Sequence, residues 1–356
     1  MPFIIENKVI EFYNYKELAF FVEDFLIVND IISFLDIWYN ESVSEIVVKT
    51  SGSSGEAKYI KHKKTSMVSS ARKTQDYFEY KARDNALLCL PVKYISGMMM
   101  LVRSIVADLN LVIANPSSHP LTHVGMRLDF AAMTPMQFHF SYQSEMNKLA
   151  SVKQILLGGA PVSNRIEKEV MQCQNAIYLG YGMTETITHI ALKRLNGPEQ
   201  EHYFKTLPGV KLSLNEHQCL KIECDHLPSI VETTDVVNLL SEDTFEWLGR
   251  SDNIINTGGI KVSSESLESV FTKLIDANLI IFGLPSDILG QQIAIAIESD
   301  SEYNLLEKVR SMNSTLLSTL KPRTLYILDH FSYTKTDKIN RNKTISRINI
   351  ESGIQL

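Results

Sequence analysis

The sequence predicts an α/β protein with a large N-terminal domain of mostly parallel sheets flanked by helices, plus a β-rich segment, and a small α+β C-terminal domain. Up to about residue 205, short apolar runs alternate with helical patterns, which is typical of βαβ units. After residue 206, apolar and polar residues alternate, which indicates antiparallel strands. The length of 356 residues also favours two domains over a single core.

The first part of the chain predicts a regular succession of strands and helices. We expect strands within 45–50, 86–92, 109–116, 129–135, 152–161 and 175–185, and helices at 64–78, 95–107 and 163–172. Thr65 and Ser163 are the expected caps of the first and last of these helices. Because ligands of such sheets bind beyond the carboxyl ends of the strands, we expect a site in the loops that follow them.

The second part of the chain predicts hairpins and short antiparallel strands instead of alternating strands and helices. We expect a hairpin over 209–224 with its turn at Asn215 and Glu216, then a strand, a charged turn, a glycine turn and a helix over 245–271, then two strands over 278–298. Ser263 or Ser264 caps that helix, with Glu265 in its first turn. We place the domain boundary near Arg250–Asp252, which gives domains 1–250 and 251–356.

Composition excludes several classes of function. The net charge of −6 and pI of about 5.9 argue against nucleic-acid binding, which needs a basic face. The four cysteines are scattered without a CxxC pair, so we expect reduced thiols rather than structural zinc or disulfides. No apolar run approaches the ~20 residues that span a bilayer, and the first residues do not resemble a signal peptide. We therefore expect a cytoplasmic protein without membrane insertion.

The stretch TSGSSGEAK, from Thr50 to Lys58, has the composition of a phosphate-binding loop. Backbone N–H groups of a glycine-rich turn bind anions, and glycine permits close approach to a phosphate. Serine hydroxyls add donors and Lys58 adds positive charge. The GxxxxGK[ST] spacing fails, because Ala57 stands where that motif has its second glycine. A flexible Gly/Ser turn explains the composition equally well.

Four more segments, in order, complete a resemblance to a known superfamily. TSGSSGEAK resembles the [ST]SG[ST]TGxPK loop of the adenylate-forming enzymes, which include acyl-CoA synthetases and peptide-synthetase adenylation domains. YLGYGMTE (178–185), VETTDVV (231–237), WLGRSDNIINTGGIKVSSESLE (247–268) and YTKTDKINR (333–341) resemble its other motifs. The chain departs from these patterns at Ala57, Thr234 and Asp337. The resemblance covers nearly the whole chain, with a shortened amino-terminal region before the first motif.

The resemblance implies ATP, Mg²⁺ and CoA as cofactors, and it assigns nucleotide-binding and catalytic roles. Lys338 would bridge the substrate carboxylate and the α-phosphate, Thr184 would donate to the α-phosphate, and Glu185 would bind Mg²⁺. The implied ATP-binding residues are Thr50, Ser51, Gly52, Ser53, Ser54, Gly55, Lys58, Gly159, Ala160, Tyr181, Gly182, Asp235 and Arg250. Without the resemblance, the simpler interpretations would be a solvated lysine for Lys338, a solvated loop glutamate for Glu185 and a core tyrosine for Tyr181.

The resemblance also implies movement of a small mobile domain. Asp252 matches the hinge about which that domain swings between adenylation and thioester formation. Gly258 and Gly259 match the turn that lines the CoA tunnel, although a simple β-turn would have the same two residues.

One segment bears on which carboxylic acid the protein would use as substrate. LPVKYISGMMMLVRSI (90–105) resembles the LPLFHxSG…R stretch of o-succinylbenzoate–CoA ligases of menaquinone biosynthesis. The residues implied at the acid substrate are Ser96, Gly97, Arg103 and Gly158. An arginine suits a substrate with a second carboxylate, whereas the alternative for Arg103 is a polar residue on a partly exposed helix face. Lys93 and Tyr94 replace the usual Phe-His pair.

The predicted function is therefore an ATP-dependent acid–CoA ligase with a small carboxylic acid, ATP and CoA as partners. Its rivals are a ligase for another aryl or aliphatic acid, an adenylation module that loads a carrier protein, and a catalytically weak nucleotide-binding protein. A homodimer is an alternative to a monomer.

Overall fold

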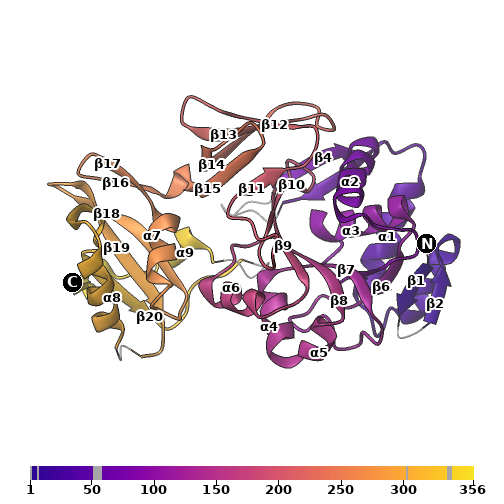
Figure 1. Ribbon diagram of the computed structural model, residues 1–356, viewed down its shortest axis with the longest axis horizontal. Coiled ribbons are helices and arrows are strands. Elements are labelled where there is room, and N and C mark those ends of the chain that lie inside the picture. Colours follow the sequence, from indigo (N-terminus) through magenta and orange to yellow (C-terminus); the bar gives the residue numbers. More distant parts are fainter. Residues whose placement is uncertain (1, 6–7, 51–57, 302–303, 335–338) are drawn as a thin grey trace.

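The computed structural model describes residues 2–5, 8–50, 58–301, 304–334 and 339–356. Within these residues the strands form one large sheet, one smaller sheet and a two-stranded ribbon (Figure 1). The large sheet has 13 strands, in the spatial order β12 (Val210–Leu214), β13 (Cys219–Cys224), β14 (Val231–Leu239), β15 (Thr244–Arg250), β11 (Phe204–Thr206), β10 (His189–Arg194), β9 (Ala176–Gly182), β8 (Val152–Leu157), β7 (Leu128–Met133), β5 (Asn85–Leu88), β6 (Asn110–Ile113), β1 (Pro2–Ile5) and β2 (Lys8–Glu11).

The large sheet has a parallel part and an antiparallel part, and β2 adds one antiparallel strand beside β1 at the far edge. From β1 through β6, β5, β7 and β8 to β9 the strands are parallel, and from β9 to β12 every neighbouring pair is antiparallel. The reversal occurs because the chain leaves β9 through the short loop 183–188 and returns directly as β10, without a crossover helix. The predicted fold class is confirmed, and the β-rich segment continues the same sheet that carries the parallel strands.

Helices cover both faces of the parallel half (Figure 1). One face is covered by α1 (Ile27–Tyr39), α2 (Lys64–Phe78) and α3 (Ile95–Ala107), and the other by α4 (Pro135–Ser144), α5 (Met146–Leu149) and α6 (Asn164–Met171). Along β7, Phe130 and Ala132 face the first layer while Ala131 and Met133 face the second, as alternation along a strand requires. A 3₁₀ segment, η1 (Phe12–Phe21), precedes α1.

Of the two N-caps predicted for helices in the first part of the chain, the structure confirms one. Ser163 caps α6 as predicted, because its hydroxyl accepts from the Ile166 N–H. The expected cap at Thr65 is wrong. The helix α2 begins at Lys64, directly after the ribbon strand β4 (Tyr59–Lys63) that pairs with β3 (Glu45–Lys49), so Lys63 occupies the cap position without a side-chain bond.

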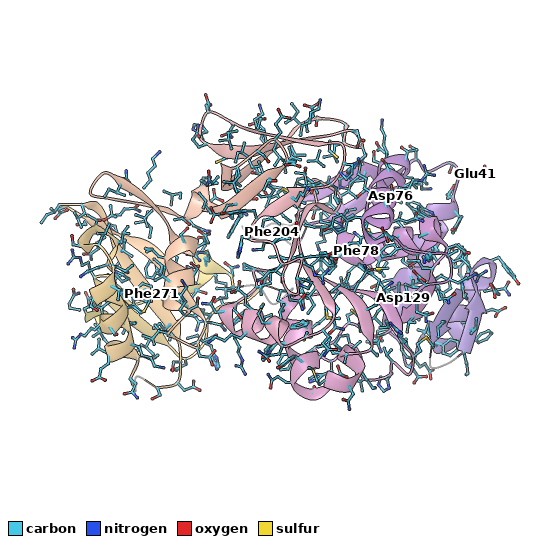
Figure 2. The ribbon with its side chains drawn as sticks, in the orientation of Figure 1. Glu41, Asp76, Phe78, Asp129, Phe204 and Phe271 are labelled. Atoms are coloured by element: carbon cyan, nitrogen blue, oxygen red, sulfur yellow. The ribbon has the colours of Figure 1, made fainter. Side chains whose placement is uncertain are left out.

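The second sheet begins after residue 253 and has its own core. Its strands are β17 (Ile260–Ser263), β16 (Ile254–Thr257), β19 (Gly290–Glu298), β20 (Thr324–Leu328), β21 (Ile354–Gln355) and β18 (Leu279–Ser286), which pairs with β19. The helical segments here are α7 (Ser264–Phe271), α8 (Leu305–Thr315), α9 (Arg341–Ile345), η3 (Ser318–Leu320) and η4 (Ile350–Ser352). Figure 2 shows Phe271 in this part, and Phe78 and Phe204 within the part that holds the large sheet.

The 3₁₀ turn η2 (Ser251–Asn253) links the two sheets. Ser263 caps α7 as predicted by accepting from the Ser266 N–H, and its hydroxyl also donates to the Leu248 carbonyl in β15 at 2.6 Å. Asn164 of α6 donates to the Thr272 hydroxyl just beyond α7 at 2.9 Å. The helix α7 is therefore held against both β15 and α6. In the described part of the chain, no helix combines the length and apolar composition that crossing a membrane requires.

Candidate functional site

The loops that follow the parallel strands lie at one edge of the large sheet. Strands β5, β7, β8 and β9 run in the same direction, so the segments after Leu88, Leu157 and Gly182 leave the sheet at a common edge. These segments carry the predicted residues Ser96, Gly97, Gly158, Gly159, Ala160, Thr184 and Glu185. The edge also contains the switch from parallel to antiparallel strands beside β9, which is where ligands of α/β sheets commonly bind.

The 183–188 loop is tightly folded. Gly182 pairs with His189 across β9 and β10, and a Cβ at Gly182 would collide with the Thr188 carbonyl oxygen, so only glycine permits this approach. The fully buried Thr186 hydroxyl accepts from the Met183 N–H at 2.9 Å. Ile187 has φ +69°, which is rare for a β-branched residue and marks stored strain of about 1–3 kcal/mol. Thr184 and Glu185, whose side chain is exposed, therefore sit in a constrained loop.

A buried histidine joins this loop to the β3–β4 ribbon. His62 in β4 donates from Nε2 to the Thr184 carbonyl oxygen at 2.7 Å, and burial lowers the pKa of His62, which favours the neutral ring. His62 lies in a lysine-rich stretch, so the composition of the sequence did not single it out. The signal was nevertheless present, since a strand of period two places His62 inward when Lys61 and Lys63 face solvent.

The ribbon also brings together the two ends of the glycine-rich segment. The Thr50 N–H donates to the Lys58 carbonyl at 2.8 Å, and the Lys58 N–H donates to the Thr50 hydroxyl at 3.1 Å. The predicted residues between them, Ser51, Gly52, Ser53, Ser54 and Gly55, lie outside the described residues. His62 therefore ties the described ends of the predicted phosphate loop to the 183–188 loop.

A second group forms where β9 meets the antiparallel strands. The Tyr181 hydroxyl donates to Asp235 Oδ2 at 2.6 Å, and burial together with the Asp235 charge raises the pKa of Tyr181, so the phenol stays protonated. The Tyr181 ring packs against Phe245 and Phe204, with centroid distances of 5.1 and 5.8 Å. These ring contacts pack the partly buried Tyr181 against the core, while its hydroxyl binds the Asp235 carboxylate.

Arg250 lies next to this pair. It is the cross-strand partner of Asp235 between β14 and β15, and its Nη2 donates to Asp252 Oδ2 at 2.7 Å. The structure thus brings four predicted residues, Tyr181, Asp235, Arg250 and Asp252, into one connected cluster beside the η2 link.

Arg103 is buried. The alternative reading of the sequence, in which Arg103 is a polar residue on a partly exposed helix face, is therefore wrong. Its side chain enters the layer between α3 and the large sheet with 3% exposure, and Nη2 donates to the Thr188 hydroxyl at 2.5 Å. Its buried Nε finds no hydrogen-bond partner among the described residues, and neither does the buried Tyr80 hydroxyl. Burial lowers the pKa of Arg103, with the nearby Tyr80 acting in the opposite sense. A buried guanidinium with an unused donor can serve an anionic group.

A hydrogen-bond chain extends from Arg103 into the core. Thr188 lies 3.2 Å from His189 Nδ1, His189 Nε2 lies 3.3 Å from the Thr74 hydroxyl, and Thr74 donates to the Ser70 carbonyl. Because Thr74 donates onward, it accepts from His189 Nε2–H, which leaves Nδ1 to accept from Thr188. Burial and the Arg103 charge hold the pKa of His189 well below its usual range.

The remaining predicted residues are not joined to these clusters. Gly97 approaches the Pro91 carbonyl so closely that a Cβ would collide with it, whereas a Cβ at Gly158 would meet open space. Gly258 and Gly259, with φ of +56° and +81°, form the two-residue turn between β16 and β17, at the left of Figure 1 and away from β9. Their conformation is the one that a hairpin turn demands.

Lys338 and its neighbour Asp337 lie outside the described residues, but the segments around them are anchored to the second sheet. Tyr333 and Ile339 form an antiparallel bridge. Arg341 pairs with Glu268 Oε1 at 2.6 Å and donates to the Ile281 carbonyl at 2.6 Å.

Comparison with known proteins defines the class. A sequence model of AMP-binding enzymes matches residues 46–222. An acyl-CoA synthetase (AMP-forming)/AMP-acid ligase II-like protein from Dyadobacter fermentans is 32% identical, over 91% of this chain and 95% of that chain, with a TM-score of 0.61. The chain therefore belongs to the AMP-binding family of adenylate-forming enzymes.

Two more distant relatives are both named as CoA ligases of succinylbenzoate. A 2-succinylbenzoate–CoA ligase of Staphylococcus aureus is 22% identical over 325 residues, which cover 83% of this chain and 66% of that protein. The o-succinylbenzoate coenzyme A synthetase of Bacillus subtilis, solved with ATP and a magnesium ion, is 19% identical over 84% of this chain and 69% of that chain, with a TM-score of 0.69. The latter likeness shows a shared fold. The chain spans about two thirds of the length of the curated relatives that it matches.

The lowered pKa of His189 predicts a pH-dependent stability. As the pH falls below about 6.5, the unfolded chain binds a proton at this residue while the folded chain does not, so folding stability decreases by about 1.4 kcal/mol per pH unit until the folded pKa is reached. The variant His189→Gln keeps a donor toward Thr74 and removes the titration. We expect the stability difference between wild type and variant, from urea unfolding at pH 5 to 8, to shrink below pH 6.5. A difference that stays constant with pH contradicts this assignment.

Proposed function

We propose that the chain is an ATP-dependent acid–CoA ligase that forms an acyl-adenylate and then a CoA thioester, and that its acid is o-succinylbenzoate, a precursor in menaquinone (vitamin K2) biosynthesis. The observation that carries the proposal is the meeting of two clusters at the β9–β10 switch. One holds the 183–188 loop against the ribbon through His62, and the other joins Tyr181, Asp235 and Arg250.

The first cluster suits the triphosphate and its metal. Thr184 donates to the α-phosphate, and the exposed Glu185 carboxylate offers the hard oxygen ligand that Mg²⁺ prefers beside phosphates. Thr50 and Lys58 flank the segment 51–57, whose N–H groups and hydroxyls bind the β- and γ-phosphates. The magnesium supplies charge neutralisation at these phosphates, while His62 keeps the Thr184 main chain in register with the ribbon.

The second cluster suits the nucleoside. The Asp235 carboxylate accepts from the ribose hydroxyls, and the Tyr181 hydroxyl orients that carboxylate by donating to Oδ2. Arg250 stands beside Asp235 on the neighbouring strand and assists at the ribose. Gly159 and Ala160, after β8, give the adenine base room because they lack bulky side chains.

The two-step reaction assigns the second sheet to a mobile domain. The large sheet ends at Arg250 and the second begins at Ile254, which supports domains 1–250 and 251–356 with Asp252 as the hinge. Lys338 comes from the second domain to neutralise charge between the carboxylate and the α-phosphate during adenylation. After rotation, Gly258 and Gly259 line the path by which CoA reaches the acyl carbonyl.

Arg103 supports the dicarboxylate as substrate. A buried guanidinium whose Nε has no partner among the described residues is energetically costly unless an anion binds to it. The second carboxylate of o-succinylbenzoate is such an anion, and Ser96, Gly97 and Gly158 follow the strands that end at the same edge. The runners-up are another aryl or aliphatic acid as substrate, and a carrier protein in place of CoA.

We expect adenylation to be specific for o-succinylbenzoate. ATP–pyrophosphate exchange, measured with o-succinylbenzoate, benzoate and a medium-chain fatty acid, should be strongest with the first, and thioester should appear when CoA is added. The variant Lys338→Ala should abolish exchange but still form thioester from supplied acyl-adenylate. No exchange above background with any acid contradicts the enzyme proposal, and exchange without thioester favours the carrier-protein alternative.

The role of Arg103 predicts a selective loss. Arg103→Met keeps an apolar stem and removes the charge, so exchange with o-succinylbenzoate should fall about 10- to 100-fold, the worth of charged hydrogen bonds of roughly 1.5–3 kcal/mol. Exchange with a monocarboxylic acid that the wild type accepts should change little. Arg72→Met, on the exposed face of α2, is the matched control. An equal loss with both acids would show that Arg103 supports the fold and does not read the substrate.

A further inference from the structure

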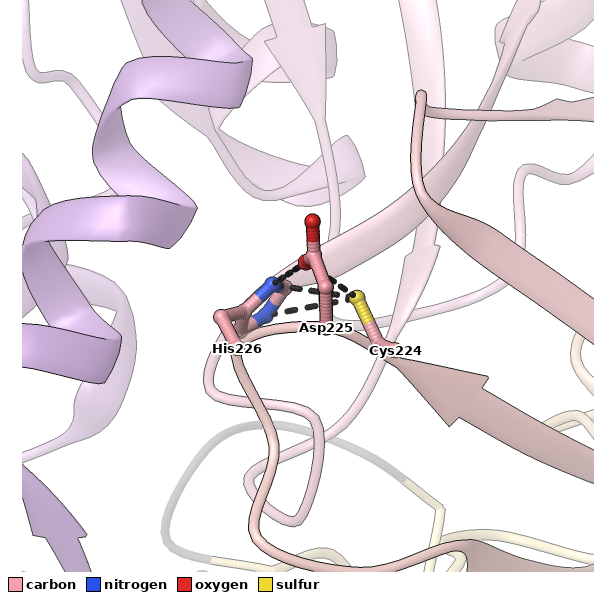
Figure 3. Close-up of side chains that lie close together, drawn as sticks. All are labelled: Cys224, Asp225 and His226. Atoms are coloured by element: carbon pink, nitrogen blue, oxygen red, sulfur yellow. Dashed lines mark hydrogen bonds and ion pairs between the residues drawn. The ribbon is translucent and has the colours of Figure 1, made fainter.

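Three different ligand-type side chains converge at the end of β13. Cys224 is the last residue of the strand, and a turn closed by a hydrogen bond from the Leu227 N–H to the Cys224 carbonyl follows it. The turn interrupts the alternation of a strand, so Asp225 does not point away from Cys224 and His226 but toward them. Figure 3 shows the thiol, the carboxylate and the imidazole facing one another.

The spacing of the three donor atoms fits one tetrahedral ion. His226 Nδ1 lies 3.4 Å from Asp225 Oδ1, and Cys224 Sγ lies 3.7 Å from Oδ1. Zinc bonds of about 2.3 Å to sulfur and about 2.0–2.2 Å to nitrogen and oxygen, set at tetrahedral angles, imply ligand separations of about 3.4–3.6 Å. The third edge, from Sγ to Nδ1, is 3.0 Å, so these two atoms must move apart by about half an ångström when an ion binds between them.

The surroundings prepare each ligand. Lys73 Nζ holds Asp225 Oδ2 at 3.0 Å and also bonds the Pro208 carbonyl, which fixes the carboxylate and leaves Oδ1 for an ion. His226 is buried, and burial lowers its pKa, so the ring has a free lone pair at neutral pH. Burial raises the pKa of the Cys224 thiol to about 11, so a metal ion that binds there must displace its proton to solvent.

We propose that Cys224, Asp225 and His226 form a binding site for a divalent transition-metal ion of the zinc class, with water as the fourth ligand. The thiolate and imidazole select zinc or cobalt over magnesium or calcium, which prefer all-oxygen sites. This site is separate from the magnesium position at Glu185 and does not depend on the proposed ligase activity. The absence of a CxxC pair argued against zinc from the sequence, but a C-x-H pair at the end of a strand, with the exposed carboxylate between them turned toward both, provides three ligands without one.

The site also has a structural consequence. His226 lies against the main chain of Thr186, the residue whose hydroxyl closes the 183–188 loop. An ion bound to the His226 ring would therefore hold in place the side chain that contacts that loop.

Cobalt is the probe that tests the site, because tetrahedral Co²⁺ bound to a thiolate has a charge-transfer absorption in the near ultraviolet. Tag-free, metal-free protein under a non-thiol reductant should bind one equivalent of Co²⁺ with this absorption, and Zn²⁺ should displace it while excess Mg²⁺ does not. Cys224→Ser should remove the thiolate absorption and weaken Co²⁺ binding by about 100-fold or more, because losing a ligand should cost at least as much as the ~10- to 100-fold seen for outer-shell partners. Cys219→Ser, at the start of the same strand, is the matched control and should bind as wild type.

A second variant keeps the test valid if Cys224→Ser fails to fold. Asp225→Ala alters an exposed side chain, so the fold should persist by far-ultraviolet circular dichroism while Co²⁺ binding weakens about 10-fold or more. Absence of the thiolate absorption in folded wild-type protein would overturn the proposal. Retention of that absorption in Cys224→Ser, or its loss in Cys219→Ser, would overturn it as well.

Discussion

The hydrogen bond from His62 to the Thr184 carbonyl is the contact on which the arrangement of the site depends. It joins the ribbon that flanks the glycine-rich segment to the 183–188 loop. That loop is confined by a second constraint, the approach of Gly182 to the Thr188 carbonyl, which reverses the chain from β9 to β10. The strain at Ile187 persists because the buried Thr186 hydroxyl and the paired strands hold both ends of the loop.

Three buried polar groups approach this loop from different elements. His62 comes from β4, Arg103 reaches Thr188 from α3, and His226 reaches the main chain of Thr186 from the end of β13. Each is a polar side chain that is costly to bury without a partner. Because all three converge on six residues, a change at one of them is expected to reach the others through the loop.

The sequence predicted those features that depend on local pattern. The predicted strands and helices between residues 64 and 182, the caps at Ser163 and Ser263 and the hairpin over 209–224 follow from periodicity and turn chemistry, and the family follows from five motifs in order. Elements such as α1, α4, β16 and β17 were not predicted. Features that depend on pairing between distant segments were missed. The main parallel and antiparallel parts of the large sheet join through β9 and β10. The buried Arg103 donates to Thr188, which lies 85 residues away in the sequence. His62 was hidden among lysines whose charge dominates the composition of that stretch.

Nucleotide binding by variants of His62 tests the central claim most directly. His62→Leu removes the donor to Thr184, whereas His62→Gln places an amide N–H where Nε2 was. Titration calorimetry with ATP and Mg²⁺, in the absence of acid, should show binding weakened about tenfold in His62→Leu, the equivalent of ~1.4 kcal/mol. It should remain near wild type in His62→Gln and in Lys61→Gln, the exposed neighbour. Wild-type affinity in a folded His62→Leu variant would contradict the account, because the loop would then keep its position without the bond.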